Sequence, residues 1–284
     1  MLFEAVIAIA SLGVVAFGLA LVLFQVLAKE VGYFFGQRMA QRYESPGEGV
    51  GVVVGGMLGL LAFVLALTLS FSSARFQERR EGTLAEANAI GTAWLQAHAV
   101  GHPRGAEIAR LLEAYTVQRR DFIRAEINSP VLAQTTERSA VLQSEIWGHL
   151  TAIVQERRDP IAASLMNSLN TTFDMATAER FAFSTTLPPQ LFFLLVGMCG
   201  ITMAALGFQL GLRQKPLRLL TVLLLCMWSA TMTVILDMGS ARLGSIRIPT
   251  QALDWTIEGF RGGVTLPAGL SVAPAEGRGV RLVP

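Results

Sequence analysis

The sequence predicts an all-α membrane protein with four transmembrane helices and a helical bundle inserted between the second and third spans. Three observations predict this class: 52% of the 284 residues are hydrophobic, only 15% are charged, and the mean hydropathy is +0.49. A soluble chain carries about 25% charged residues, so this chain lacks the polar surface that a soluble enzyme needs. The net charge of +2 gives no reason to expect a nucleic-acid partner.

Four apolar stretches are long enough to cross a bilayer, whose hydrocarbon core requires a helix of about 20 apolar residues. No Asp, Glu, Lys or Arg lies in the middle of any of them, which argues against a charged site at mid-membrane. The first lacks the basic start and the short apolar core of a secretory signal, so we expect it to be retained. The spans run from Ala5 to Ala28, from Gly49 to Ser73, from Pro189 to Leu212 and from Leu217 to Leu236.

The segment between the second and third spans has a different composition, with twelve arginines and thirteen acidic residues. Breakers such as Gly101-His102-Pro103 and Asn128-Ser129-Pro130 divide it, and Asp159-Pro160 is typical of an N-cap followed by a first-turn proline. Apolar residues recur at helical spacing, which favours amphipathic helices that pack as a bundle outside the bilayer. The expected helices are Arg75–Ala99, Gly105–Ile127, Val131–Arg158 and one from Pro160 to Thr186.

The C-terminal tail is less regular. Ser245 to Ile248 is expected to form a short strand or an extended segment, and Gln251 to Phe260 a short amphipathic helix. From Gly262 onward the tail is rich in glycine, alanine and proline, which is typical of a loose segment. The predicted division is therefore residues 1–73 (spans one and two), 74–189 (bundle), 190–238 (spans three and four) and 239–284 (tail, partly disordered).

Span two carries a glycine stripe at four-residue intervals: Gly51, Gly55 and Gly59. Glycine at this spacing lets another helix backbone approach closely in lipid. Either the stripe packs against a helix of the same subunit, or span two surrounds a central axis in a homo-oligomer.

In the second interpretation, the residues that follow the stripe would form a pore. An apolar ring gates by excluding water, and the expected ring is Phe63, Leu67 and Phe71. A basic ring would attract anions at the mouth, and the expected residues are Arg75, Arg79 and Arg80. Glu78 and Glu81 are interleaved with these arginines, so the charges could instead form pairs on the helix surface.

No motif indicates catalysis, a cofactor or a metal site. Cys199 and Cys226 lie singly in apolar runs, and no acidic or thiol ligand completes a metal site around His98, His102 or His149. No nucleophile motif or glycine-rich nucleotide loop is present. The sequence therefore predicts neither an enzyme nor a cofactor.

Two segments resemble the bestrophin-like family of small bacterial membrane proteins. The run EANAIGTAWLQA from Glu86 to Ala97 is similar to a family segment and includes Glu86, Asn88 and Gly91. The run from Asp237 through Arg242 and Gly244 is similar to the family's ending, an Asp-rich turn followed by Gly-x-Ile-x-Val. Here Gly239, Ser240 and Ala241 occupy positions where the family has Asp, Arg and Pro.

The resemblance implies an oligomeric anion channel of the bacterial inner membrane, with span two lining the pore and the bundle on the cytosolic side. The charge count argues for the opposite orientation, because the two short loops carry the basic residues Lys29, Arg38, Arg42, Arg213, Lys215 and Arg218 and short basic loops stay cytoplasmic. By that count the termini and the bundle face outward. A calcium gate is not expected, since only Asp254, Glu258 and Glu276 follow Asp237.

Two functions therefore stay open. The first is a homo-oligomeric channel for small inorganic anions in the lipid bilayer. The second is a non-conducting membrane protein whose bundle senses or binds a partner.

Overall fold

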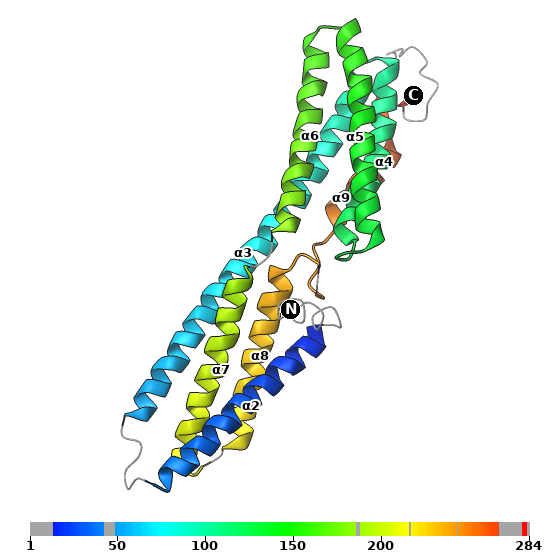
Figure 1. The fold of residues 1–284 in the computed structure, drawn as a ribbon. Coiled ribbons are helices and arrows are strands. Elements are labelled where there is room, and N and C mark those ends of the chain that lie inside the picture. Colours follow the sequence, from blue (N-terminus) through cyan, green and yellow to red (C-terminus); the bar gives the residue numbers. More distant parts are fainter. Residues whose placement is uncertain are drawn as a thin grey trace. The chain divides into compact units, whose positions relative to one another are not determined.

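The computed structural model describes residues 14–42, 49–185, 188–215, 217–242, 244–266 and 280–282 (Figure 1). In this part of the chain it contains eight helices and one pair of three-residue strands, so the all-α prediction is confirmed. The helices are α2 (Val14–Ala40), α3 (Val50–Ala99), α4 (Pro103–Arg124), α5 (Pro130–Glu156), α6 (Pro160–Ser184), α7 (Pro189–Leu212), α8 (Arg218–Gly239) and α9 (Gln251–Gly262).

Four of these helices are long and apolar enough to cross a membrane, as predicted: α2, α3, α7 and α8. The predicted end of the first span at Ala28 is wrong, because α2 continues through Lys29 and Glu30 to Ala40. The Lys29 ammonium lies 2.7 Å from the Glu30 carboxylate and 5.4 Å from the centre of the Tyr33 ring. Glu30 and Tyr33 offset the free-energy cost of burying the Lys29 charge, so the helix does not end at this residue. The predicted start of this span, residues 5–13, lies outside the described residues.

The second predicted span and the first predicted helix of the insert form one continuous helix, the 50-residue α3. Nothing between Ser73 and Arg75 breaks a helix, because neither proline nor glycine lies there. The chain divides into two compact units, and α3 contributes residues 50–76 to unit 1 and residues 77–99 to unit 2. Unit 1 also holds α2, α7 and α8, and unit 2 also holds α4, α5, α6 and α9.

Unit 1 is held together by an apolar core from all four of its helices. A buried hydrogen bond of 2.7 Å from Gln25 Nε2 to Ser229 Oγ joins α2 to α8. The buried core residues are Phe17, Leu21, Leu61, Leu65, Phe192, Leu195, Cys199, Met203, Leu225, Met232 and Ile235.

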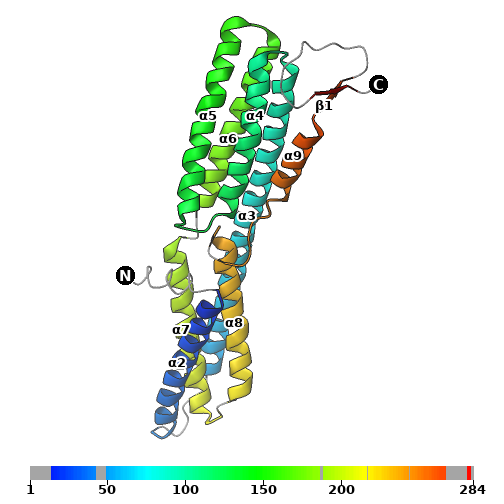
Figure 2. The same ribbon diagram turned by 90° about the vertical axis from the view of Figure 1, so that its right-hand side faces the viewer.

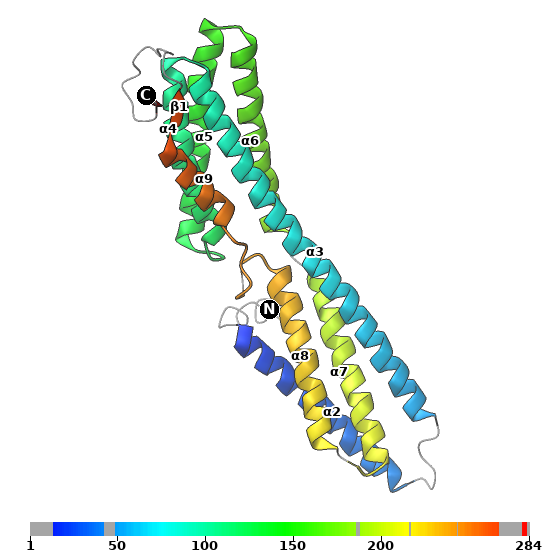
Figure 3. The ribbon, with the colours of Figure 1, turned by 180° about the vertical axis from the view of Figure 1, so that it is seen from behind.

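The closest approach in unit 1 is between α2 and α7, which lie side by side (Figures 1 and 3). A Cβ atom on Gly32 would lie 1.9 Å from the backbone oxygen of Ala204, and one on Gly207 would lie 2.0 Å from that of Lys29. Gly36 and Gly211 are equally close to the opposite helix. Both helices therefore carry a Gly-x-x-x-Gly pair at their contact, the arrangement that lets helix backbones touch in lipid.

Gly207→Leu is expected to destabilise unit 1 by about 3 kcal/mol or more, because the side chain would have to displace the α2 backbone. Gly197→Leu, on the same helix, is the matched control, since a Cβ at Gly197 meets nothing within 4 Å in the described chain. Thermal unfolding in mild detergent measures both variants. Equal melting temperatures would mean that the α2–α7 contact is not tight.

Unit 2 has its own core, formed by α3, α4, α5 and α6 (Figure 2). The second, third and fourth predicted helices of the insert are confirmed as α4, α5 and α6, with ends shifted by a few residues, whereas the first is the second half of α3. Asp159 caps α6 as predicted, because its Oδ1 accepts a 2.8 Å hydrogen bond from the Ala162 amide. The largest fully buried apolar side chains are Tyr115, Ile90, Ile108, Leu112, Leu142, Ile146, Leu150, Ile153, Leu165 and Leu169.

The tail differs from the prediction in one respect and agrees in another. The predicted helix from Gln251 is confirmed as α9, which lies beside α4 (Figure 3). Of the two alternatives for Ser245 to Ile248, the strand is not formed, because two amides of this segment bond to the Asp237 carboxylate instead of to a neighbouring strand. The strands lie at Val264–Leu266 (β1) and Val280–Leu282 (β2), which pair in parallel. Part of the predicted loose tail, residues 267–279, lies outside the described residues.

Candidate functional site

The apolar part of α3 is the least covered of the four candidate spans, since 17% of its most apolar window is buried against 39% for α7. Val54, Leu61 and Leu65 face the core of unit 1. At about 100° per residue, the opposite side of α3 carries the glycine stripe and the large apolar residues that follow it. This outward face is not covered by the described part of the chain.

The glycine stripe separates into two parts. A Cβ at Gly51 would lie 3.0 Å from Gln209 Nε2, so this residue faces α7. Gly55 and Gly59 have open space where a Cβ would stand, within the described residues. Gly55 and Gly59 therefore bring α3 against no helix of the described chain, whereas the glycines of α2 and α7 form such a contact.

The three residues predicted as an apolar ring lie on the outward face of α3. Phe63 is 60% exposed, Leu67 55% and Phe71 41%. The Arg75 guanidinium lies 5.2 Å from the centre of the Phe71 ring, in the geometry of a cation–π contact. Phe63, Leu67 and Phe71 are thus exposed and do not belong to the unit 1 core.

The three arginines predicted at the mouth are not equivalent. Arg79 is 1% exposed and points into unit 2. Its Nε donates to the Ala182 carbonyl at 3.0 Å and its Nη2 to the Thr185 carbonyl at 2.7 Å. These carbonyls end α6, where a cation is favourable. Arg75 is half-buried and Arg80 is exposed.

Glu86, from the segment of family resemblance, is fully buried in unit 2. Its two carboxylate oxygens accept hydrogen bonds from Nε and Nη2 of Arg119 on α4, the second at 3.1 Å. This bidentate pair has the planar match that favours arginine. Asn88 is exposed, and Gly91 faces α9, where a Cβ would lie 3.9 Å from the Thr256 methyl.

A second buried carboxyl, Glu179 on α6, lies close to this pair. Its Oε1 is 2.5 Å from Thr83 Oγ1, and its Oε2 makes no hydrogen bond in the described part of the chain. Burial is the main cause that raises the pKa of Glu179 to about 7, and the charge of Glu86 raises it further. Thr83, Arg119 and Arg79 act in the opposite direction. Burial in unit 2 therefore raises the pKa of the Glu179 carboxyl toward neutral pH.

The second resembling segment forms a closed turn after α8. The Asp237 carboxylate is buried and accepts bonds from the Ser245 amide (3.1 Å), the Ser245 hydroxyl (3.0 Å) and the Ile246 amide (3.2 Å). A Cβ at Gly244 would overlap the same carboxylate at 1.6 Å. Arg242 is also buried in this turn. Asp237 and Gly244 thus act together to hold the chain as it leaves α8.

The sequence analysis did not predict the buried side chains of Glu179 and Arg119 in unit 2, nor the α2–α7 contact. The residue spacing in the sequence contains a signal for each of them. Glu179 follows Leu165, Leu169, Thr172 and Ala176 at alternating intervals of three and four residues, the spacing of a buried helix face. Arg119 continues the same spacing on α4. The glycines at 32 and 36, and at 207 and 211, form the four-residue pairs noted above only for span two.

The described residues contain no group of three or more His, Cys, Asp or Glu side chains that could hold a metal ion. His102 instead caps α4 by accepting from the Arg104 amide at 3.1 Å, and its Nε2 lies 2.8 Å from Glu156. His98 packs edge-on against Trp94, and burial lowers the pKa of its imidazole.

Comparison with solved structures finds this fold in bacterial bestrophin homologues. A variant of the bestrophin homologue from Klebsiella pneumoniae has a TM-score of 0.65 and 15% identity, over 85% of this chain and 95% of that chain. The Klebsiella pneumoniae homologue solved by zinc phasing has a TM-score of 0.59 and 16% identity, over 83% and 95%. No protein-family model and no curated protein matches the sequence. The chain has a bestrophin-like fold, as the resemblance implied, and its four apolar helices are those of a multi-pass membrane protein.

Proposed function

We propose that this chain assembles with copies of itself around an axis lined by α3 and passes small inorganic anions across the bacterial inner membrane. The observation that carries the proposal is the outward face of α3. Only 17% of the most apolar window of α3 is buried, against 28–39% for the other three spans, and α3 leaves Gly55, Gly59, Phe63 and Leu67 uncovered by the described chain.

The chemistry of this face suits a gated pore better than a permanently open one. The large apolar side chains would form a narrow ring from which water is excluded, so an ion would lose its hydration on entering. Arg75 and Arg80 would supply the positive mouth. Arg79 is left out of this role because its guanidinium bonds to the end of α6.

Liposomes that contain the double variant Phe63→Ala and Leu67→Ala should pass chloride at least about tenfold faster than wild type, because the ring becomes wider and wetter. The matched control is Leu19→Ala with Leu23→Ala, which removes two equally exposed apolar side chains from α2. Arg75→Glu with Arg80→Glu should move selectivity toward cations. If no variant exceeds empty liposomes while its oligomer is intact, the non-conducting, partner-binding function replaces the channel.

We also propose that residues 74–189 and the tail stand outside the bilayer, on the outer side. The support is the excess of basic residues in the two short loops; the bestrophin arrangement implies the cytosolic side. Ser144, exposed on α5, is a suitable reporter, in a chain whose Cys199 and Cys226 are replaced by alanine. Ser144→Cys should react with an impermeant thiol reagent on intact spheroplasts. Reaction only after lysis would place unit 2 in the cytosol.

A further inference from the structure

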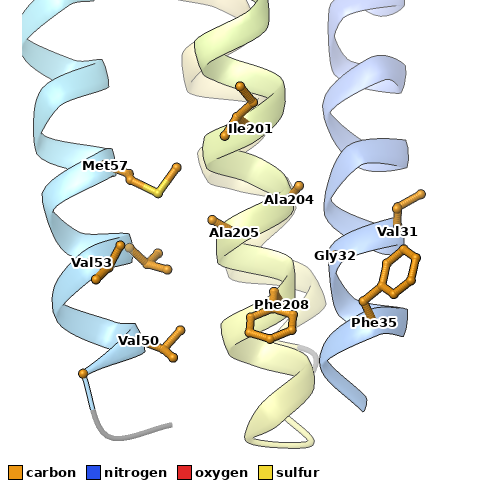
Figure 4. A pocket seen from close by; sticks show the side chains of 12 residues that line it. Val31, Gly32, Phe35, Val50, Val53, Met57, Ile201, Ala204, Ala205 and Phe208 are labelled. Carbon is orange, nitrogen blue, oxygen red and sulfur yellow. The ribbon is translucent and has the colours of Figure 1, made fainter. Parts of the chain in front are cut away.

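Unit 1 contains an apolar cavity of about 700 Å³ between α2, α3 and α7, which is open to the surroundings and lined in part by exposed side chains (Figure 4). This volume lies in the range of about 300–1,000 Å³ that is usual for small-molecule sites. The walls are almost entirely hydrocarbon, contributed by side chains that include Val31, Phe35, Val53, Met57, Ile201 and Phe208.

The cavity exists because α7 presents small residues where α3 and α2 face it. Ala204 and Ala205 line the α7 wall with small side chains, and Gly32 lines the α2 wall. The close contact of Gly32 with Ala204 brings α2 against α7, while Val53 and Met57 of α3 form the facing wall (Figure 4). A polar ligand would lose hydration here without gaining a hydrogen bond.

One end of the cavity, next to Val50 and Phe208, is bordered by polar and charged groups. A Cβ at Gly51 would lie 3.0 Å from Gln209 Nε2 and 3.6 Å from Arg213 Nη2, so both side chains lie against the first turn of α3. The ends of α2 and α7 and the start of α8 carry exposed basic residues, which are Arg38, Arg42, Arg213, Lys215 and Arg218. In the sequence of these two loops, Glu44 and Glu48 are the acidic residues, so positive charge is in excess.

We propose that this cavity binds an acyl chain of an anionic phospholipid whose phosphate is held by Arg213. A hydrocarbon chain matches the apolar wall, and guanidinium is well suited to phosphate. Basic residues next to a span attract anionic headgroups. A second copy of this chain is a poorer occupant, because docking through the same loops would bring like charges together.

Native mass spectrometry of the full chain, with added phosphatidylglycerol or phosphatidylcholine, tests the site. Wild type should retain phosphatidylglycerol in preference to phosphatidylcholine. Ala205→Phe, which fills the cavity, should lose bound lipid of both kinds. Arg213→Gln should keep the cavity, but its preference for phosphatidylglycerol over phosphatidylcholine should be about fivefold smaller than that of wild type. Arg138→Gln, an exposed arginine on α5, is the matched control and should behave as wild type.

Two results would overturn the proposal. In the first, Arg213→Gln and Arg138→Gln show the same lipid preference as wild type. In the second, Ala205→Phe keeps its lipid while its oligomer dissociates, which would assign the cavity to a second copy. Arg213 is exposed, so its variant tests the site even if Ala205→Phe fails to fold. The measurement is of binding and does not depend on ion conduction.

Discussion

Replacing Arg119 with methionine is expected to lower the free energy of unfolding by about 3–5 kcal/mol. The Glu86 carboxylate is fully buried, and Arg119 supplies its bidentate partner. Removing the arginine leaves a buried charge without compensation, which costs more than the pair itself contributes.

Urea unfolding of the full chain in detergent, followed by tryptophan fluorescence, measures this effect. Trp94, Trp147 and Trp255 all lie in unit 2. The double variant Glu86→Gln with Arg119→Met should recover most of the lost stability, because neither of these two positions then carries a buried charge. Arg110→Met removes an exposed arginine paired with Glu107 and should cost less than about 1 kcal/mol. Equal losses for Arg119→Met and Arg110→Met would show that the buried pair is not formed.

The second large effect is a fall in the stability of unit 2 as the pH rises from about 5 to 8. The folded-state pKa of Glu179 is raised to about 7 by burial, whereas an unfolded glutamate titrates near 4.3. Between these values the folded state binds more protons than the unfolded state, so stability decreases with pH. The full difference between the two pKa values corresponds to about 4 kcal/mol.

Thr83 stabilises the ionised form of Glu179 only in part, because its hydroxyl has a second acceptor. The Thr83 Oγ1 lies 3.0 Å from the Arg79 carbonyl and 2.5 Å from Glu179 Oε1, but a hydroxyl has one hydrogen to donate. When Glu179 is protonated, its O–H donates to Thr83, and Thr83 donates to the carbonyl. When Glu179 is ionised, Thr83 can satisfy only one of the two acceptors.

Glu179→Gln should therefore raise the melting temperature at pH 8 and remove most of the pH dependence between about 5 and 8. The amide of glutamine can donate to Thr83 as the protonated acid does. Glu137→Gln, at an exposed position of α5, serves as the control and should leave the pH profile unchanged. A Glu179→Gln profile that follows the wild-type profile would mean that Glu179 titrates normally.

The sequence alone determined the class of this protein and its elements. A run of about 20 apolar residues is stable in a bilayer as an α-helix, because each backbone polar group must be hydrogen-bonded within the segment. Prolines and capping side chains, such as Ser129 and Asp159, set the starts of α5 and α6 through local contacts. These features depend on neighbours in the chain, so they can be predicted without the fold.

The tertiary structure alone decided which residues of each helix meet. Glycines recur at four-residue intervals on α2, α3 and α7, but only those of α2 and α7 are in backbone contact, while Gly55 and Gly59 of α3 remain open within the described chain. Arg75, Arg79 and Arg80 are close in sequence, yet only Arg79 turns inward to the end of α6. Spacing specifies a helix face, whereas the partner of that face depends on residues about one hundred positions away. The spacing along α6 places Glu179 on a buried helix face, but the packing around that face decides how far burial raises its pKa.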